Sequence, residues 1–400
     1  MAAPELDDRL ERYAAVAVRV GANVGPGQTL FIDAQIEHAP LVRALARQAY
    51  AAGARYVDVR YGDQHVRRAM IELGPDEVLE HSPAWMVERS EAMAGNARIG
   101  TSGDPAPHLL ADLDGERVGR ARMKEVTRVL FRQLTDRLVN WTGVASPNEG
   151  WAQEVFGEPD VERLWEAVSV CTRLDEPDPV EAWRLHMERL DRRAKALNEL
   201  GLDRLTYRGP GTELEIGLLE RSRFCSALFK TVDERPYVAN MPTEEVFATP
   251  DARRAEGFVR STKPLALAGE VIEGLRFTFE GGRIVDVQAD KGADVVRGQL
   301  ETDENACRLG EVALVDGTSR VGQTGITFFD TLYDENATCH IAYGAAVGEG
   351  YDGESDDDGV NDSLVHTDFM VGGPEVDVDG VTRDGRVIPL LREDVWQLPE

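Results

Sequence analysis

Cysteine is scarce in this chain, and its placement excludes several kinds of site. The four cysteines stand far apart, and none has the Cys-x-x-Cys spacing of a structural zinc site or of a redox motif: Cys171, Cys225, Cys307 and Cys339. They do not suggest a disulfide framework either, so a reducing compartment is expected. Cys339 directly precedes His340. We interpret it as a packing residue; a nucleophile served by that histidine is the alternative, although neighbouring side chains diverge in a strand.

Positive charge is also in short supply. The 400 residues include 44 Lys and Arg against 72 Asp and Glu, which gives a formal net charge of −28. Nucleic acid and anionic membrane surfaces would be repelled, so neither is expected as a partner. A mainly acidic surface suits a cationic ligand instead, such as a peptide with a free amino terminus.

Long apolar runs and nucleotide fingerprints are both missing. No stretch approaches the roughly 18 uninterrupted apolar residues that a membrane span needs. The start, "MAAPELDDRLERY", is acidic and helical, unlike a secretory signal, so a cytoplasmic location is expected. Neither GxGxxG nor GxxxxGK[ST] occurs, and the glycines of "VGPGQTLFI" precede a strand where a phosphate loop would follow one. Nucleotide binding therefore has little support.

The first half of the chain alternates helices and strands. "TLFIDA" (29–34) reads as a buried strand, "HAPLVRALARQAYAAGA" (38–54) as a helix and "RYVDVRYGD" (55–63) as a second strand. This order predicts a βαβ unit with a parallel sheet. Residues from about 105 to 200 look mainly helical, with 115–134 and 179–200 as long periodic segments.

The sequence pattern changes after Gly201. Short strands with glycine turns follow, and "FEGGRI" is a hairpin signal. A chain of 400 residues also exceeds one ordinary core. We therefore predict two domains, an N-terminal α/β domain with a parallel sheet (1–200) and a β-rich, α+β C-terminal domain (201–400) that carries the metal site and the catalytic groups.

An apolar run near the C-terminus, "LVHTDFMV" (364–371), contains two ionisable residues. In an extended chain, alternate side chains share a face, so His366 and Asp368 would project together with Met370 while Phe369 points the other way. Buried charge is costly unless it is paired or bound to metal. The pair is either a buried hydrogen-bonded couple or two metal ligands delivered by one strand.

Similar residues recur in three other motifs. "NMPTEEVFATPD" holds Glu244 and Glu245, "LGEVALV" holds Glu311, and "DENATCHIAYG" holds Glu335 and His340. Two of the seven histidines lie in these motifs, and we interpret the other five as surface residues: His38, His65, His81, His108 and His186. Two histidines and three carboxylates from separate strands would suffice for two divalent cations with one bridging carboxylate.

The four motifs, in this order, resemble the metal-binding motifs of the M29 family of metalloaminopeptidases. "GANVGPGQTL", "AYAAGARYVDV", "WAQEVFGEPDVERLWEAV" and "GPGTELEIGL" are similar to the same family, so the resemblance covers nearly the whole chain. It implies a cytosolic, homodimeric exopeptidase that removes N-terminal residues from peptides with a metal-bridged water. The implied cofactors are two divalent ions, zinc or cobalt first and manganese or magnesium as alternatives. The implied ligands are Glu245, Glu311, His340, His366 and Asp368.

A carboxylate that holds no metal would carry the proton during hydrolysis, and Glu335 and Glu244 are the candidates. Glu244 must face away from Glu245 in an extended run, so these two neighbours should differ in role. One departure from the family pattern is Val347, which stands where the family has a tyrosine near the metals. Tyr351, four residues further on, is the candidate substitute for that phenol.

Two other interpretations remain open. A non-haem iron ring-cleaving dioxygenase on the same scaffold would need only two histidines and one carboxylate. The presence of both Glu245 and Glu311 argues against it, since a mononuclear site has no use for so many carboxylates. A non-catalytic metal-binding homologue is the second alternative, and Val347 is the observation that motivates it.

Overall fold

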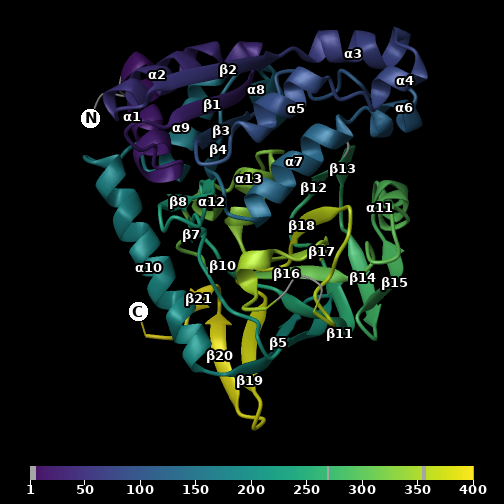
Figure 1. Ribbon diagram of the computed structural model, residues 1–400. Coiled ribbons are helices and arrows are strands. Elements are labelled where there is room, and N and C mark those ends of the chain that lie inside the picture. Colours follow the sequence, from purple (N-terminus) through teal and green to yellow (C-terminus); the bar gives the residue numbers. More distant parts are fainter. Residues whose placement is uncertain (1–5, 268–269, 354–356, 400) are drawn as a thin grey trace. The chain divides into compact units, whose positions relative to one another are not determined.

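The computed structural model describes residues 6–267, 270–353 and 357–399 (Figure 1). These residues form two compact units. Unit 1 comprises the described residues up to Arg184 together with Leu228–Met241, and unit 2 comprises Leu185–Ala227 and the described residues from Pro242 onward. The chain thus passes between the units three times. The predicted division into domains 1–200 and 201–400 stays a prediction.

Unit 1 is built on a five-stranded parallel sheet of order β2-β1-β3-β4-β9 (Figure 1). Its strands are β1 (Thr29–Gln35), β2 (Tyr56–Gly62), β3 (Ala97–Ser102), β4 (Asn140–Ala145) and β9 (Asn240–Met241). The interior strand β1 has the apolar run Leu-Phe-Ile, which is buried as expected for a strand with both faces covered. The predicted βαβ unit and its parallel pairing are confirmed.

The other elements of unit 1 are helices and one small hairpin. They are α1 (Leu6–Val16), the π-helical turn η1 (Ala17–Gly21), the 3₁₀ turn η2 (Ile36–His38), α2 (Ala39–Ala51), α3 (Gln64–Leu73), α4 (Asp76–Leu79), α5 (Ala84–Glu91), α6 (Gly115–Arg120), α7 (Lys124–Thr135), α8 (Glu149–Phe156), α9 (Val161–Cys171), β7 (Leu228–Lys230) and β8 (Pro236–Val238). The expected continuous helix over 115–134 is wrong, because α6 and α7 are separate. Helix α6 buries no side chain, so packing does not support its continuation.

Unit 2 contains an eight-stranded antiparallel sheet of order β15-β14-β11-β6-β5-β19-β20-β21. Its strands are β5 (Leu202–Gly209), β6 (Thr212–Leu218), β11 (Pro250–Arg260), β14 (Arg276–Glu280), β15 (Arg283–Gln288), β19 (Asp377–Thr382), β20 (Val387–Arg392) and β21 (Val395–Trp396). The predicted hairpin joins β14 to β15, and both glycines of its turn, Gly281 and Gly282, have positive φ (55° and 77°). The predicted β-rich C-terminal region is confirmed.

A second, four-stranded sheet of order β10-β16-β17-β18 is also antiparallel (Figure 1). It consists of β10 (Val246–Ala248), β16 (Leu309–Leu314), β17 (His340–Gly344) and β18 (His366–Met370). The remaining elements of unit 2 are β12 (Leu265–Leu267), β13 (Glu270–Ile272), α11 (Ala293–Leu300), α12 (Arg320–Gln323), α13 (Thr331–Asp334), η3 (Glu335–Ala337) and η4 (Gly348–Gly350). The long helix α10 (Pro179–Glu199) contains residues of both units.

One face of the four-stranded sheet packs in an aromatic core. Phe277 of β14 lies with its ring centroid 5.7 Å from that of Tyr343 and 5.0 Å from that of Phe369, both edge to face. Tyr343 and Phe369 alternate along their strands with the polar residues discussed below. The apolar face therefore fixes the strands, and the polar residues project from the opposite face.

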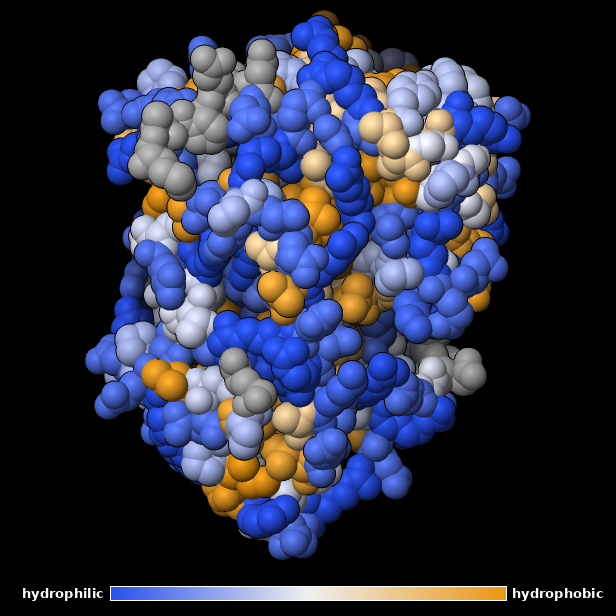
Figure 2. Space-filling model, turned by 90° about the vertical axis from the view of Figure 1, so that its left-hand side faces the viewer, coloured by the Kyte–Doolittle hydropathy of each residue, from blue (hydrophilic) through white to orange (hydrophobic). Residues whose placement is uncertain are grey.

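The face drawn in Figure 2 is mostly hydrophilic, with its apolar residues in small separate groups, as a chain with 29% charged residues predicts. Among the described residues, none of the helices combines the length and the apolar character required to cross a bilayer.

Candidate metal centre

The register of three neighbouring strands determines the layout of the candidate site. Asp368 of β18 lies opposite Ala342 of β17, and Ala342 lies opposite Glu311 of β16. Neighbouring strands are about 4.8 Å apart, so the two carboxylates rise on either side of a single methyl group. Ala342 therefore leaves room between the carboxylates that a larger side chain would fill.

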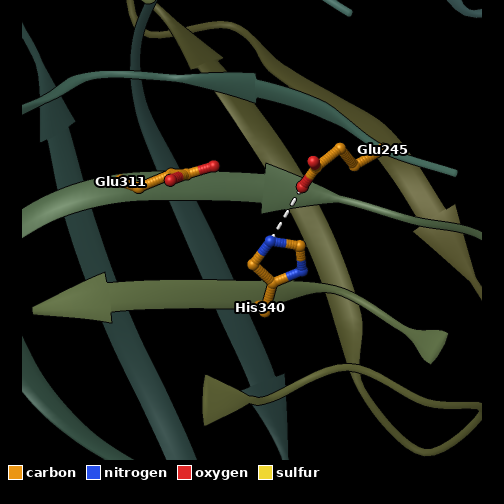
Figure 3. Close-up of side chains that lie close together, drawn as sticks. All are labelled: Glu245, Glu311 and His340. Atoms are coloured by element: carbon orange, nitrogen blue, oxygen red, sulfur yellow. Dashed lines mark ion pairs between the residues drawn. The ribbon is translucent and has the colours of Figure 1, made fainter. Parts of the chain in front are cut away.

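All five predicted ligands come together in two groups. In the first, Glu245, Glu311 and His340 have ligand atoms that all lie within 4.8 Å of one another, and Figure 3 shows His340 reaching toward Glu245. The distance from His340 Nε2 to Glu245 Oε2 is 2.8 Å. In the second group, His366 Nε2 lies 3.2 Å from Glu311 Oε2 and 3.4 Å from Asp368 Oδ2. Glu311 belongs to both groups.

Backbone carbonyls orient both imidazole rings. His366 Nδ1 lies 2.8 Å from the Ala345 carbonyl oxygen, and His340 Nδ1 lies 3.3 Å from that of Thr338. An Nδ1–H that donates to a carbonyl leaves Nε2 directed at the carboxylates, and histidines that bind metal are commonly held in this way. The ring orientation is therefore built into β17 and β18.

The site concentrates negative charge in a buried place. Burial, together with the nearby charges of Asp368 and Glu245, raises the pKa of Glu311 to about 6, although the contact with His366 lowers it. Burial lowers the pKa of His340, but Glu245, Asp368 and Glu311 outweigh burial and bring it to about 10. The pKa of His366 is also raised, because Asp368 and Glu311 outweigh burial. Protons on the imidazoles thus balance the carboxylates, a role that a cation can take over.

The donor set fits divalent cations. Asp368 Oδ1 is buried and accepts no hydrogen bond from any described residue. A buried carboxylate oxygen without a partner is costly, and a bound cation would remove that cost. Imidazole nitrogen and carboxylate oxygen together suit zinc, cobalt and manganese, and magnesium where oxygen dominates. The residues present therefore match the metals expected from the sequence.

Glu335, a predicted catalytic residue, lies beside the two groups and belongs to neither. It begins the 3₁₀ turn η3, is buried, and lines the same small cavity as Asp368. Burial raises its pKa well above the usual value, and the charges of Asp368 and Glu245 add to the effect. A carboxyl group that holds a proton next to the ligands is suited to proton transfer.

Glu244 has a different environment from its neighbour Glu245. Its Oε2 lies 3.4 Å from His186 Nε2, and its backbone N–H donates to Asn336 Oδ1 at 2.8 Å. His186 Nε2 also lies 2.9 Å from the Thr243 carbonyl oxygen. The expectation that the two glutamates face apart is confirmed, and Glu244 contacts the helix α10 rather than the other carboxylates.

The interpretation of five histidines as surface residues is wrong for two of them. His186 is buried because it lies on the apolar stripe of α10, near Trp183, Met187 and Leu190, and this helical spacing is the signal that the sequence offered. His38 is buried with Nδ1 2.7 Å from Thr101 Oγ1 and Nε2 2.9 Å from the Gly103 carbonyl oxygen. Exposure is confirmed for the other three: His65, His81 and His108.

The tyrosines near Val347 are engaged elsewhere. The Tyr351 hydroxyl donates to Asp357 Oδ2 at 2.8 Å, and no hydrogen bond or ion pair within the described part of the chain joins it to the five candidate ligands. The Tyr343 hydroxyl donates to Gln299 on the opposite face of the sheet. Val347 itself accepts a hydrogen bond from Thr249 Oγ1 through its carbonyl oxygen. A catalytic contribution from Tyr351 stays a prediction and would require its bond to Asp357 to break.

Cys339 is a packing residue, as interpreted from the sequence. It is buried, and its thiol donates to the Val315 carbonyl oxygen at 3.2 Å. Burial raises the pKa of the thiol to about 12, so almost no thiolate exists at neutral pH. The alternative of a cysteine nucleophile is wrong.

Asn336 links the segment of Glu244 to η3, and its replacement by alanine is expected to destabilise the protein. The buried amide accepts from the Glu244 N–H and donates to the Leu332 carbonyl oxygen at 3.0 Å. Leaving these groups unpaired should lower the free energy of unfolding by about 1–3 kcal/mol, measured by chemical denaturation. Gln153→Ala, at an exposed helical position, is the matched control and should change it by less than about 0.5 kcal/mol. Equal stability of the two variants would contradict the role of Asn336.

Two histidines and three carboxylates, grouped on one sheet and in the segment directly before it, in a chain that has both an α/β unit and a β-rich unit, define a metalloenzyme. Comparison with protein families narrows this class. The profile described as thermophilic metalloprotease (M29) matches residues 6–396. The chain belongs to this M29 family, as the motifs predicted.

Individual relatives extend the comparison over nearly the full length. Aminopeptidase T of Thermus aquaticus is 42% identical over 402 residues, which cover 97% of this chain and 98% of the relative. Aminopeptidase 2 of Geobacillus stearothermophilus is 37% identical over 406 residues, 98% of each chain. The solved structure of wild-type AmpT from Thermus thermophilus has a TM-score of 0.91 and 41% identity, covering 98% of this chain and 99% of that chain. None of these findings favours the dioxygenase alternative.

Proposed function

We propose that this protein is a metal-dependent aminopeptidase, which removes the N-terminal residue from peptides. The observation that carries the proposal is the sharing of Glu311 by two groups of metal-ligating side chains, each with its own histidine. The M29 family membership and the relatives named aminopeptidases support it. The proposed ligands of two divalent ions are Glu245, Glu311, His340, His366 and Asp368.

The chain prepares two neighbouring cation sites. Glu245 and His340 would hold one ion, His366 and Asp368 would hold the other, and Glu311 would bridge them. Zinc or cobalt is proposed first, with manganese or magnesium as alternatives. When bound, such ions would lower the pKa of a coordinated water to about 7 and would polarise the scissile carbonyl. Ala342 keeps the space between Glu311 and Asp368 clear for this purpose.

Glu335 is the proposed proton carrier. It lines the same cavity as Asp368 and is itself in neither ligand group. Two bound cations would favour the ionised form of Glu335, and in that form it can take the proton of the attacking water and deliver it to the nitrogen of the leaving amine. Glu244 was the other candidate, but its carboxylate contacts His186, so it is assigned to holding the segment that carries Glu245.

Exopeptidase register follows from the nitrogen of the free amine. The α-amine of a peptide, in its unprotonated form, has a lone pair that could coordinate a divalent ion held by the candidate ligands. An acetylated amine lacks the basic nitrogen. Peptides with a free N-terminus are therefore the proposed substrates.

A small set of chromogenic substrates tests this function. Leucyl p-nitroanilide should be hydrolysed at least about tenfold faster than its N-acetyl derivative, which corresponds to about 1.4 kcal/mol or more of amine recognition. Exhaustive chelation should remove the activity, and added zinc or cobalt should restore it. Equal rates for the two substrates would refute the anchoring of the amine. Two bound ions without any hydrolysis would instead indicate a non-catalytic metal-binding homologue.

We also propose, from the resemblance stated above, that the protein is a cytoplasmic homodimer. Light scattering coupled to size-exclusion chromatography should give twice the chain mass of 44.1 kDa. Cell fractionation should recover the protein with cytoplasmic markers. A monomer mass, or recovery in another fraction, would refute the corresponding part of this proposal.

A further inference from the structure

The carbonyl that holds His366 belongs to a tight corner of the chain directly after β17. The Ala345 carbonyl oxygen lies 2.8 Å from His366 Nδ1. Gly344, the last residue of β17, has a φ of 100°, and a Cβ there would lie 2.1 Å from the Val365 carbonyl oxygen. Glycine alone fits this conformation and this approach. The chain therefore leaves β17 close against the segment that precedes His366, with the Ala345 carbonyl facing the ring.

One buried residue holds both ends of this corner. Asn361 Nδ2 donates to the Gly344 carbonyl oxygen at 2.5 Å, and the Asn361 carbonyl oxygen accepts the Ala346 N–H at 2.8 Å. Ala345 thus lies between two hydrogen bonds to the same residue. Asn361 is only 5% exposed, so water competes little for these bonds. The position of the Ala345 carbonyl is therefore set by Asn361.

The amide of Asn361 is also anchored to a third segment. Its Nδ2 lies 3.0 Å from the Asn305 carbonyl oxygen and 3.3 Å from that of Arg308, which directly precedes β16. Strand β16 does not depend on this amide for its attachment to β17, because the Gly344 N–H donates to the Arg308 carbonyl oxygen at 2.7 Å. Loss of the amide should therefore disturb the corner that faces His366 more than it disturbs β16.

We propose that Asn361 is a positioning residue for the cation site of His366. It fixes the Ala345 carbonyl. That carbonyl in turn directs His366 Nε2 toward Glu311 and Asp368. The inference rests on the metal-dependent function proposed above. A histidine that binds a cation through Nε2 keeps its ring proton on Nδ1, where the carbonyl accepts it, and partners of this kind are worth about 10–100-fold in metal affinity.

Titration of the metal-free protein with cobalt(II) tests this role, because it measures binding without turnover. The wild type is expected to take up two ions. Asn361→Ala should bind one of them about 10–100-fold more weakly. In the His366→Ala background, where one ion is expected, adding Asn361→Ala should change the affinity by less than about twofold, because the residue through which Asn361 acts is already gone.

Asn198→Ala is the matched control. The Asn198 side chain likewise holds the backbone of another segment of unit 2, since it accepts the Phe224 N–H and donates to the Phe224 carbonyl oxygen, both at 2.8 Å. It belongs to neither ligand group, so both cobalt affinities should equal those of the wild type. Asn361→Ser replaces the alanine variant if that variant does not fold. The serine hydroxyl ends one bond short of the amide nitrogen, so the same loss of affinity is expected.

Visible absorption of bound cobalt(II) gives a second readout, which a general loss of stability would not change. The part of the spectrum that the wild type has and His366→Ala lacks belongs to the His366 site. This part should change in fully loaded Asn361→Ala and stay unchanged in Asn198→Ala. Equal affinities and spectra for the wild type and Asn361→Ala, or an equal loss of affinity in the His366→Ala background, would overturn the role of Asn361 alone. A wild type that binds no cobalt would instead overturn the proposed function.

Discussion

Replacement of Glu311 by glutamine is expected to remove both bound ions and to abolish hydrolysis while the protein stays folded. Among the residues that the structure describes, Glu311 is the one that belongs to both candidate ligand groups, and an amide oxygen is a far weaker ligand than a carboxylate. Bound ions would contribute several kcal/mol of transition-state stabilisation. Because the variant loses this contribution, its kcat/KM should fall at least about 10³-fold. Metal analysis and the leucyl p-nitroanilide assay measure the two effects.

The fold is expected to survive this change for an electrostatic reason. Burial, with Asp368 and Glu245 nearby, already raises the pKa of Glu311 to about 6, so the carboxylate is an unfavourable charge in the absence of metal. Glutamine keeps its shape and removes that charge. Circular dichroism of the metal-free variant should match that of the metal-free wild type.

Two further variants make the result specific. Glu213→Gln, an exposed position on β6, should retain both ions and full activity. His366→Ala removes a ligand from one group only and should lower the metal content from two ions to one. If Glu311→Gln still bound two ions, the shared-ligand arrangement would be refuted.

Sequence reasoning could place some of the candidate ligands together because strand periodicity decides which side chains share a face. His366 and Asp368 could be placed together from alternation alone. The pairing of Ala342 between Glu311 and Asp368 could not, because it depends on the register of three strands that are distant in sequence. The order of the four motifs pointed to the candidate residues. The space between Glu311 and Asp368 becomes visible only from the pairing register of β16, β17 and β18.

The same distinction explains the misplaced histidines. His186 lies on the helical stripe of Trp183 and Leu190, so its burial was readable from local spacing. His38 follows no such pattern, and its partners Thr101 and Gly103 are more than 60 residues away in the chain. The return of Leu228–Met241 to unit 1 is likewise a long-range event. The sequence of its short strands does not indicate locally that β9 joins the parallel sheet of unit 1.

Replacement of Glu335 by glutamine should separate proton transfer from metal binding. Glutamine cannot exchange a proton, and general acid–base catalysis contributes about 10²–10⁴-fold, so kcat should fall by that factor. Both ions should remain, since Glu335 belongs to neither ligand group. KM should change little, because the amide fills the same volume beside Asp368. Loss of metal from this variant would make Glu335 a ligand and would contradict the assigned role.

Glu244→Gln is the decisive comparison, since Glu244 and Glu335 were equal candidates on sequence grounds. Its carboxylate contacts His186, and its backbone is held by Asn336 on the way to Glu245. The amide should therefore lower the free energy of unfolding and reduce kcat by less than about tenfold, well short of the range given by acid–base catalysis. A larger loss of kcat with Glu244→Gln than with Glu335→Gln would exchange the two assignments. In that case, the direction in which each carboxylate projects would not predict its chemical role.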